Sequence, residues 1–329
     1  MALKEELLRL LEENCGKTLS GEEMAKRLYV SRNAVWKAVC ALRKEGVQID
    51  AAPRRGYRLL ESGNFLSALS VSSKLSEPLC GRLFVQVKES TGSTNSDLKA
   101  LAEKGCAHGY VLIAKEQTAG KGRLGRSFCS PKGTGLYMSI LLRPKFSAEE
   151  ALFITTSAAV AVSEAIDRFS GAESKIKWVN DVYLSGKKVC GILTEAAMDF
   201  ESGGLNYAVC GIGVNLSAER LPKALEGIAG GIMTEQSGEN DLRAPLAAEI
   251  LNRFFHYYDR LPALDFLSEY RRRSLLIGRE IVFLKNGREY GGTAVDLDDR
   301  ARLVVRLDSG ELTALSSGEA TLKKGDFIK

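Results

Sequence analysis

The pattern of apolar and polar positions changes twice along the chain, near residue 62 and near residue 272. Up to the first point, apolar residues recur three and four positions apart, as in short amphipathic helices. Between the two points, strand-like apolar runs alternate with longer helical patterns, and after the second point only short strand patterns remain. The sequence therefore predicts a helical domain over 1–62, a serine-rich linker over 63–80, a mixed α+β domain over 81–272 and a small all-β domain over 273–329.

The first part is predicted to hold two helices with a tight connection. Ser20 and Glu23 form a capping box that starts a helix over 21–28, and Ser31 starts a second helix that runs to Lys44 and is closed by Gly46. Its buried stripe is predicted at Val35, Val39 and Leu42. A hairpin of 47–52 with 57–59 follows, so this part is predicted to be a winged helix-turn-helix.

Basic residues are concentrated in the same part of the chain. Residues 26–58 hold nine Lys and Arg against two acidic residues, whereas the whole chain has 46 against 41. Such a local excess is expected of a surface that binds nucleic acid. The residues predicted to contact DNA are Arg32, Asn33, Trp36, Lys37, Arg54 and Arg55. The alternative is a small helical domain with a solvated basic face.

The other two parts carry the remaining predicted elements. In the central part, strands are predicted at 110–117, 136–142, 175–179, 188–195 and 207–215, and helices at 93–103, 151–169 and 242–261. In the last part, strands are predicted at 281–285, 303–307 and 312–315. Asn286-Gly287 favours a hairpin turn there, and the segment is predicted to form a small β-barrel.

Composition excludes several classes of protein. No apolar stretch approaches the length of a membrane-spanning helix, and the N-terminal residues lack the apolar core of a signal peptide. The seven cysteines form no C-x-x-C pair, and the two histidines lie far apart. Neither a zinc site nor a Ser-His-Asp triad is therefore expected. The chain is expected to be cytoplasmic with reduced thiols and without membrane contact, and its metal ligands, if any, are not identifiable.

A loop rich in glycine and basic residues follows the first central strand. The glycines at 120, 122 and 125 match G-x-G-x-x-G, but no helix can follow in 127–135, so a dinucleotide site is not indicated. Lys121, Arg123 and Arg126 alternate with these glycines. A mobile glycine backbone with guanidinium groups can close over phosphate oxygens. A solvated hairpin loop is the alternative.

A lysine strand and two glycine-containing strands complete the pattern. In Lys175-Ile176-Lys177-Trp178, the two lysines face the side opposite Ile176 and Trp178, and Asn180-Asp181 forms a turn. A lysine on an inward face needs an anion. Gly191, in the next strand, and Gly211 with Gly213, in the one after, indicate a bulge, a close ligand or packing.

In this order, these stretches resemble the biotin protein ligases, most closely the bifunctional type that also represses biotin genes. The matching residues are Ser93-Thr94-Asn95, Gln117 with Gly120–Arg126, Lys177-Trp178 with Asn180-Asp181, Gly191-Ile192-Leu193, and Gly213 with Asn215. The resemblance covers the chain. It implies a class II synthetase-like ligase core related to lipoate ligases and an SH3-like C-terminal barrel.

The resemblance also implies the activity and its partners. Members join biotin to AMP with ATP and Mg²⁺ and transfer it to a lysine of a biotin carboxyl carrier domain. The repressor type binds operator DNA as a homodimer promoted by biotinyl-AMP.

The site residues are carried over by motif. Lys177 and Arg123 are implied as catalytic. Biotin contacts are implied for Ser93, Thr94, Asn95, Gln117, Gly120, Lys121, Arg123, Lys177, Gly191, Ile192 and Leu193. ATP or adenylate contacts are implied for Arg123, Arg126, Phe128, Lys177, Asn180 and Asn215.

The chain departs from the common family pattern at four positions. Lys121 and Leu124 stand where basic residues, often arginine, are found, Phe128 replaces a tryptophan and Val179 a proline. Two alternatives remain at this point. One is a lipoate-type ligase, against which the hydrogen-bonding groups of Gln117 and Ser93-Thr94 favour biotin. The other is a sensor-repressor with an inactive ligase core, against which the intact Lys177, Arg123 and Arg126 argue.

Overall fold

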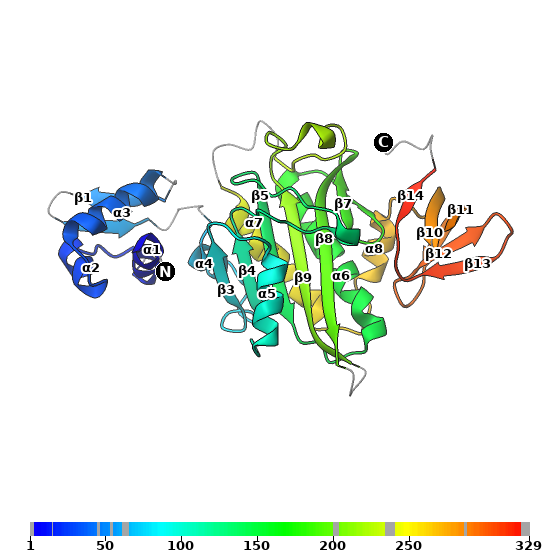
Figure 1. The fold of residues 1–329 in the computed structure, drawn as a ribbon, viewed down its shortest axis with the longest axis horizontal. Coiled ribbons are helices and arrows are strands. Elements are labelled where there is room, and N and C mark those ends of the chain that lie inside the picture. Colours follow the sequence, from blue (N-terminus) through cyan, green and yellow to red (C-terminus); the bar gives the residue numbers. More distant parts are fainter. Residues whose placement is uncertain are drawn as a thin grey trace. The chain divides into compact units, whose positions relative to one another are not determined.

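A computed structural model describes residues 3–14, 16–44, 47–52, 55–60, 66–199, 204–233, 241–285 and 288–323. By their contacts, the residues fall into two compact units. The first comprises 1–73 with 240–245, and the second comprises 74–239 with 246–329 (Figure 1). No helix in the described part is both long and apolar enough to cross a membrane.

The first unit is a helix-turn-helix with a β-hairpin. It contains helices α1 (Leu3–Glu13), α2 (Gly21–Arg27), α3 (Arg32–Lys44) and α4 (Ala68–Ser72), and strands β1 (Ile49–Ala52) and β2 (Gly56–Leu59). The hydroxyl of Ser20 accepts from the Glu23 N–H at 3.1 Å, and that of Ser31 from the Ala34 N–H at 3.2 Å, so both predicted helix starts are confirmed.

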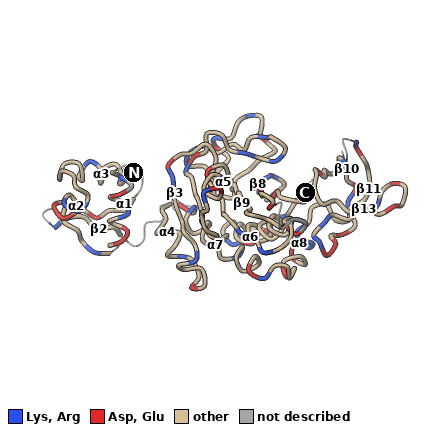
Figure 2. The backbone as a smooth tube through the Cα atoms, turned by 60° about the horizontal axis from the view of Figure 1, so that its bottom comes forward, with Lys and Arg blue, Asp and Glu red and all other residues tan. Residues whose placement is uncertain are grey.

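Apolar residues from every element of the helix-turn-helix form its core. The predicted stripe of Val35, Val39 and Leu42 is buried against Leu7, Leu11 and Met24 of the other two helices. The hairpin adds Ile49 and Leu59, which face each other in the antiparallel register. Arg32, Lys37 and Arg43, which lie away from this core, are exposed, and Figure 2 colours Lys and Arg along α3 blue.

The second unit is built on a mixed seven-stranded sheet in the order β3-β4-β5-β9-β8-β7-β6. Its strands are β3 (Phe84–Lys88), β4 (Tyr110–Ala114), β5 (Gly135–Leu142), β6 (Lys175–Lys177), β7 (Asp181–Leu184), β8 (Lys187–Met198) and β9 (Leu205–Asn215). β3 and β4 are parallel, and every other pair is antiparallel.

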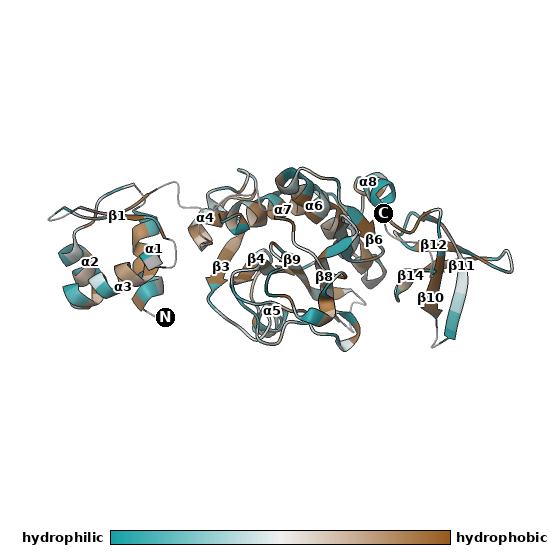
Figure 3. Cartoon of the chain, turned by 90° about the horizontal axis from the view of Figure 1, so that it is seen from above, coloured by the Kyte–Doolittle hydropathy of each residue, from teal (hydrophilic) through white to brown (hydrophobic). Residues whose placement is uncertain are grey.

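Helices cover both faces of this sheet. α5 (Thr94–Glu103) lies on one face, and α6 (Leu152–Ser170) and α7 (Arg243–Tyr258) lie on the other (Figure 3). α8 (Leu267–Arg273) packs beside α6, and short 3-10 turns occur at Arg123–Gly125, Ala148–Ala151 and Lys223–Leu225. α6 is buried along most of its length because it lies between the sheet and other helices.

A five-stranded antiparallel sheet follows in the same unit. Its order is β13-β12-β11-β10-β14, from β10 (Glu280–Lys285), β11 (Arg288–Leu297), β12 (Leu303–Leu307), β13 (Leu312–Leu315) and β14 (Ala320–Leu322). The predicted strands 303–307 and 312–315 are confirmed. β10 and β11 pair as the predicted hairpin, although Asn286 and Gly287 lie outside the described residues, as does Gly46.

Several elements differ from the sequence-based predictions. The strand predicted at 110–117 ends at Ala114, because Gln117 turns to bridge Thr91 and Ser130. The strand predicted at 175–179 ends at Lys177. The predicted helices at 93–103, 151–169 and 242–261 are confirmed with ends shifted by at most three residues. Strands β3 and β7 and helix α8 were not predicted, since each is short.

The segment predicted as a linker is more structured than a linker. Its residues 66–80 include α4, which Ser67 caps by accepting from the Ser70 N–H at 3.0 Å. Leu66, Val71, Leu75 and Leu79 are buried. Serine residues therefore serve here as helix caps between buried apolar positions. The domain limits themselves remain predictions.

Candidate active site and DNA-binding surface

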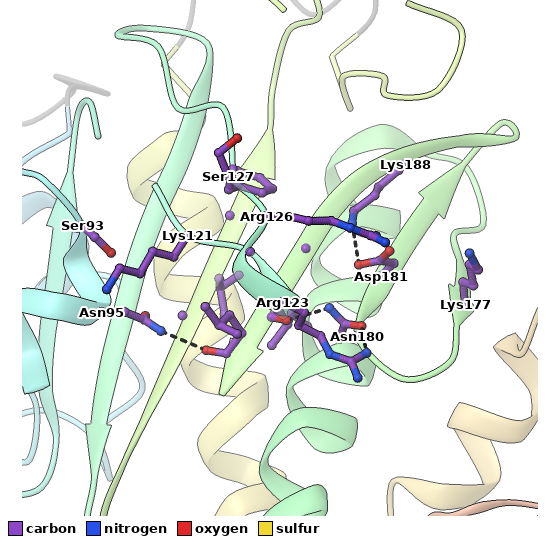
Figure 4. A pocket seen from close by; sticks show the side chains of 18 of the residues that line it. Ser93, Asn95, Lys121, Arg123, Arg126, Ser127, Lys177, Asn180, Asp181 and Lys188 are labelled. Atoms are coloured by element: carbon purple, nitrogen blue, oxygen red, sulfur yellow. Dashed lines mark hydrogen bonds and ion pairs between the residues drawn. The ribbon is translucent and has the colours of Figure 1, made fainter. Parts of the chain in front are cut away.

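A cavity of about 340 Å³ opens on the face of the large sheet that carries α5. Segments far apart in the sequence enclose it: the N-terminus of α5, the loop after β4, the turn between β6 and β7, the middle of β8 and β9, and the start of β14. Among its lining residues are Ser93, Thr94, Asn95, Gln117, Lys121, Arg123, Arg126, Phe128, Lys177, Asn180, Gly191, Ile192 and Leu193. The structure thus brings together most of the side chains predicted from the sequence (Figure 4).

Two predicted residues, Gly120 and Asn215, do not line this cavity. A Cβ on Gly120 would collide with the carbonyl oxygen of Phe128, and the Gly120 carbonyl accepts from the Phe128 N–H at 2.8 Å. Gly120 therefore shapes the loop. Asn215 is buried at the end of β9, where its carbonyl accepts from the Ile232 N–H at 3.1 Å.

A polar cluster lies at the N-terminus of α5. The Gln117 Oε1 accepts from both the N–H and the hydroxyl of Thr94, at 2.9 and 3.1 Å, and its Nε2 donates to Ser130 Oγ at 2.9 Å. Ser93 occupies the N-cap position of α5 but its side chain makes no capping hydrogen bond. Its hydroxyl is therefore available to a ligand, whereas Gln117 is held in one orientation.

Asn95 has a different surrounding from its neighbours. Its Nδ2 donates to the Leu193 carbonyl at 3.2 Å and to Glu195 Oε2 at 2.9 Å, and its Oδ1 accepts from Ser139 Oγ at 2.6 Å. A Cβ on Gly211 would collide with this Oδ1. Protein groups thus satisfy most of the hydrogen-bonding capacity of Asn95, which ties α5 to β8 and β5.

The floor of the cavity is made of glycines on neighbouring strands. Gly191 of β8 pairs with Gly213 of β9 in the sheet register. A Cβ on Gly213 would lie 2.5 Å from the Phe128 ring, and one on Gly191 would lie 3.3 Å from it. The absence of side chains at these two positions lets an aromatic ring approach the strand backbones.

The glycine-arginine loop is held over this floor by its two arginines. Arg123 donates to Asn180 Oδ1 at 2.8 Å and to the Gly318 carbonyl at 2.9 Å. Arg126 forms a two-point ion pair with Glu319, with distances of 2.8 and 2.6 Å. Residues just before β14 therefore position both guanidinium groups, a contribution that the sequence analysis did not foresee.

Asn180 connects the loop to the sheet. Its Nδ2 donates to the Ile192 carbonyl at 2.8 Å, and its own carbonyl accepts from the Ile192 N–H at 2.9 Å. Because its Oδ1 also receives Arg123, one side chain joins the β6–β7 turn, β8 and the loop.

Three lysines line the cavity, and Lys188 is the one that was not predicted. Lys188 forms an ion pair with Asp181 at 2.6 Å, and its Nζ would lie 3.6 Å from a Cβ on Gly191. It therefore lies next to the glycine floor, whereas Lys177 projects from β6 at the side of the cavity (Figure 4). The signal available in the sequence was a lysine at the start of the glycine-containing strand 188–195.

Burial lowers the pKa of Lys177. The neighbouring cations Lys188 and Arg126 lower it further, while Asp181 and Glu319 raise it in part. An anion bound in the cavity would favour the charged ammonium form. Within the described ranges, no three His, Cys, Asp or Glu side chains group closely enough to hold a metal ion.

Comparison with known proteins covers all three parts of the chain. Residues 86–215 match the Biotin/lipoate A/B protein ligase family, 4–58 match an HTH domain, and 276–323 match the Biotin protein ligase C terminal domain. The bifunctional ligase/repressor BirA of Bacillus subtilis (strain 168) is 31% identical over 313 residues, which cover 94% of this chain and 95% of that protein.

The chain belongs to the biotin protein ligase family. The bifunctional ligase/repressor BirA of Escherichia coli (strain K12) is 27% identical over 314 residues, 94% of this chain and 95% of that protein. The biotin protein ligase from Aquifex aeolicus in complex with biotin and ATP has a TM-score of 0.61 at 27% identity, over 73% of this chain and 98% of that chain. These matches confirm the predicted fold class: a helix-turn-helix, a ligase core and a C-terminal SH3-like domain.

The helix-turn-helix of this ligase presents the side chains predicted to contact DNA. Arg32, Asn33, Trp36 and Lys37 are exposed on α3, opposite its buried stripe. Arg55 is exposed in the hairpin, and Arg54 lies outside the described residues. Neither Arg32 nor Lys37 forms an ion pair with any residue that the structure describes, so both are available to phosphate or base edges.

Proposed function

We propose that the chain activates biotin with ATP to biotinyl-5'-AMP, transfers biotin to a lysine of a biotin carboxyl carrier domain, and represses biotin genes through its N-terminal unit. The observation that carries the ligase part is the cluster of cations around the paired glycines Gly191 and Gly213. The Phe128 ring lies against these glycines, and Arg123, Arg126, Lys177 and Lys188 supply positive charge around the same cavity.

In the first step, a biotin carboxylate oxygen bonds to the α-phosphorus of ATP, and pyrophosphate leaves. Negative charge accumulates on the phosphoryl oxygens as this happens. Cations already held in place stabilise that charge without reorganising. We assign this role to Arg123 and Lys188, which the protein itself orients, together with Lys177. Arg126 is ion-paired with Glu319, so it must release this carboxylate before it can contact a phosphate oxygen.

Mg²⁺ is proposed to arrive with the ATP phosphates, which it neutralises when bound. This metal commonly takes only one or two protein carboxylates besides substrate phosphates. Asp181 and Glu319 are the carboxylates among the lining residues. Each is already paired with a cation, so either could turn to a metal only by releasing Lys188 or Arg126.

In the second step, the amine of the acceptor lysine attacks the biotinyl carbonyl carbon and loses a proton. An amide bond forms, the acyl–phosphate bond breaks and AMP leaves. The mixed anhydride is open to hydrolysis in the meantime. A loop closed over it by Arg123 and Arg126 excludes water.

Biotin is favoured over lipoate by the polar cluster at the start of α5. Ser93, Thr94 and Gln117 offer donors and acceptors in fixed positions, which suit the ureido ring of biotin. Lipoate, with its flexible chain and dithiolane ring, has no ureido group that could hydrogen-bond with this polar cluster.

The ligase proposal is tested by incubating the chain with ATP, Mg²⁺, biotin and an apo carboxyl carrier domain, with lipoate in parallel. The mass of one biotin on the carrier, dependent on ATP, is expected. Labelling with lipoate alone would place the chain with the lipoate ligases, and no labelling would favour a sensor-repressor. Lys177→Ala is expected to form biotinyl-AMP much more slowly than the parent, and a parental rate would contradict its catalytic role.

The repressor part of the proposal rests on the exposed basic face of α3 and on Arg55. Operator binding as a homodimer promoted by biotinyl-AMP is carried over from the family resemblance, because two-fold operators match dimeric helix-turn-helix proteins. Sedimentation with and without biotin plus ATP tests the dimer, and retention of the mass of a monomer under both conditions would contradict it.

A further inference from the structure

Helix α2 ends in a turn in which one residue must adopt the left-handed backbone conformation. Leu28 is its C-cap residue. The N–H of Tyr29 donates to the Lys26 carbonyl at 3.3 Å, and the N–H of Val30 donates to the Ala25 carbonyl at 3.0 Å. These two hydrogen bonds define a Schellman motif, in which the residue after the C-cap has a positive φ. Tyr29 has that position, with φ 54°.

Glycine is the usual residue at this position, and this chain uses it elsewhere. Helix α6 ends at Gly171 with φ 70°. A tyrosine in the left-handed region clashes with its own backbone, which costs about fivefold in the folding equilibrium of the unit. The side chain of Tyr29 is 96% exposed, so packing within the described part of the chain does not offset this cost.

Glycine would make the same two hydrogen bonds at a lower cost, so an exposed tyrosine at this position suggests a function for its side chain. Tyr29 lies two residues before Ser31, which caps α3. The recognition helix of a helix-turn-helix enters the major groove with its N-terminus first, and the chain just before it passes the sugar–phosphate backbone. Tyrosine hydroxyls are common donors to phosphate oxygens.

We propose that Tyr29 is a DNA-contact residue, whose hydroxyl donates to a backbone phosphate at the edge of the major groove entered by α3. This inference rests on the DNA-binding part of the proposed function. It adds an uncharged contact to the cationic ones of Arg32, Lys37 and Arg55. Such a contact positions the protein on the duplex without reading the sequence.

The test compares four full-length chains, the parent and the variants Tyr29→Phe, Tyr29→Gly and Tyr29→Asn. Two probes are used: a short duplex that the parent selects from random-sequence DNA in the presence of biotin, ATP and Mg²⁺, and an unselected mixed-sequence duplex of equal length. Affinities are measured over a range of salt concentrations. Hydrogen exchange of the α2 and α3 amides is measured on the same chains.

Loss of the hydroxyl in Tyr29→Phe is expected to weaken binding to both duplexes by about tenfold, as for a hydrogen bond to a charged group. Tyr29→Gly and Tyr29→Asn are expected to lose at least as much. The dependence of affinity on salt should stay parental, because no charge is removed. In Tyr29→Gly, the α2 and α3 amides should exchange about fivefold more slowly, because the backbone strain is relieved.

Weaker binding together with slower exchange would support the proposal, because a better-folded variant cannot bind less through unfolding. Parental affinity of Tyr29→Gly and Tyr29→Phe would overturn it. A loss confined to the selected duplex would also overturn it, in favour of a base contact, and faster exchange in Tyr29→Gly would indicate a structural role instead. If the parent itself selected no duplex and bound no mixed-sequence DNA, the DNA-binding proposal would fail as well, whatever the Tyr29 variants did.

Discussion

The two units hold their positive charges in opposite ways. On α3 and the hairpin, Arg32, Lys37 and Arg55 are exposed, and none of them forms an ion pair with a described residue. In the ligase cavity, Arg123 is held by Asn180 and Gly318, Arg126 by Glu319, and Lys188 by Asp181. The first set is exposed to solvent, and the second is held by protein groups before any substrate arrives.

This difference corresponds to two uses of charge. A mobile surface cation attracts phosphates and releases counterions, so its contribution depends on salt and little on exact position. A cation that stabilises a transition state must already be in place, because moving it during the reaction would cost the free energy that it is meant to supply. The predictions below test whether the two sets behave in these two ways.

The largest effect is expected for Lys188→Gln. Glutamine keeps a donor for Asp181 but removes the charge beside Gly191. The rate of biotinyl-AMP formation should fall about 100-fold, the usual cost of removing a preorganised stabilising group. Lys175→Gln is the matched control, since Lys175 pairs with Glu173 at 2.8 Å outside the cavity. A near-parental rate for Lys188→Gln would mean that the charge of Lys188 does not stabilise the transition state of adenylation.

A second prediction concerns the contacts that place the cavity residues. Gly211→Ala puts a methyl group against the buried Asn95 side chain, and should lower the free energy of unfolding of this unit by about 2 kcal/mol and raise the KM for biotin. Gly92→Ala is the control, because a Cβ there would meet nothing within 4 Å. Denaturant titration and biotin kinetics check both, and equal stability of the two variants would contradict the prediction.

A smaller effect is expected in the first unit. Arg55→Ala should weaken binding to DNA of any sequence several-fold and lower the salt dependence by about one counterion. The double variant Arg54→Ala with Arg55→Ala should show the same trend more strongly. Affinity titrations over a range of salt concentrations measure this, and an unchanged slope would exclude the hairpin from the interface.

The smallest change concerns the pH profile of adenylation. Because burial lowers the pKa of Lys177, its ammonium loses the proton at a lower pH than an exposed lysine does. If the charged form is the active one, kcat/KM should decline as pH rises through this lowered pKa. Lys177→Arg should shift that decline to higher pH, because a guanidinium stays charged. Superimposable profiles would show that Lys177 does not titrate in the reaction.

Much of the first unit was predictable because its information is local. Ser20 and Ser31 cap the helices that follow them, and the spacing of Val35, Val39 and Leu42 sets which side chains of α3 remain outside. The exposure of Arg32 and Lys37 follows from the same 3.6-residue period. Tyr29 was not foreseen, since its conformation is set by the hydrogen bonds at the end of α2 and not by its own preference.

Most residues that line the cavity could be predicted from the sequence, but the contacts that hold them in place could not. Motif order, through the family resemblance, named Gln117, Arg123 and Asn180 as site residues. It did not show that Gly318 and Glu319, just before β14, would hold the loop arginines, or that Lys188 would lie next to the glycine floor.

The sequence by itself determined most of the helices and strands, the exposed face of α3 and the family to which the residues point. These depend on periodicity, capping and motif order, which act over a few neighbouring residues. The tertiary structure decided which charges are held and which are free, and that Gly191 faces Gly213 beneath Phe128. Strand register and contacts between distant segments set these features, and no short stretch of sequence contains both partners of such a contact.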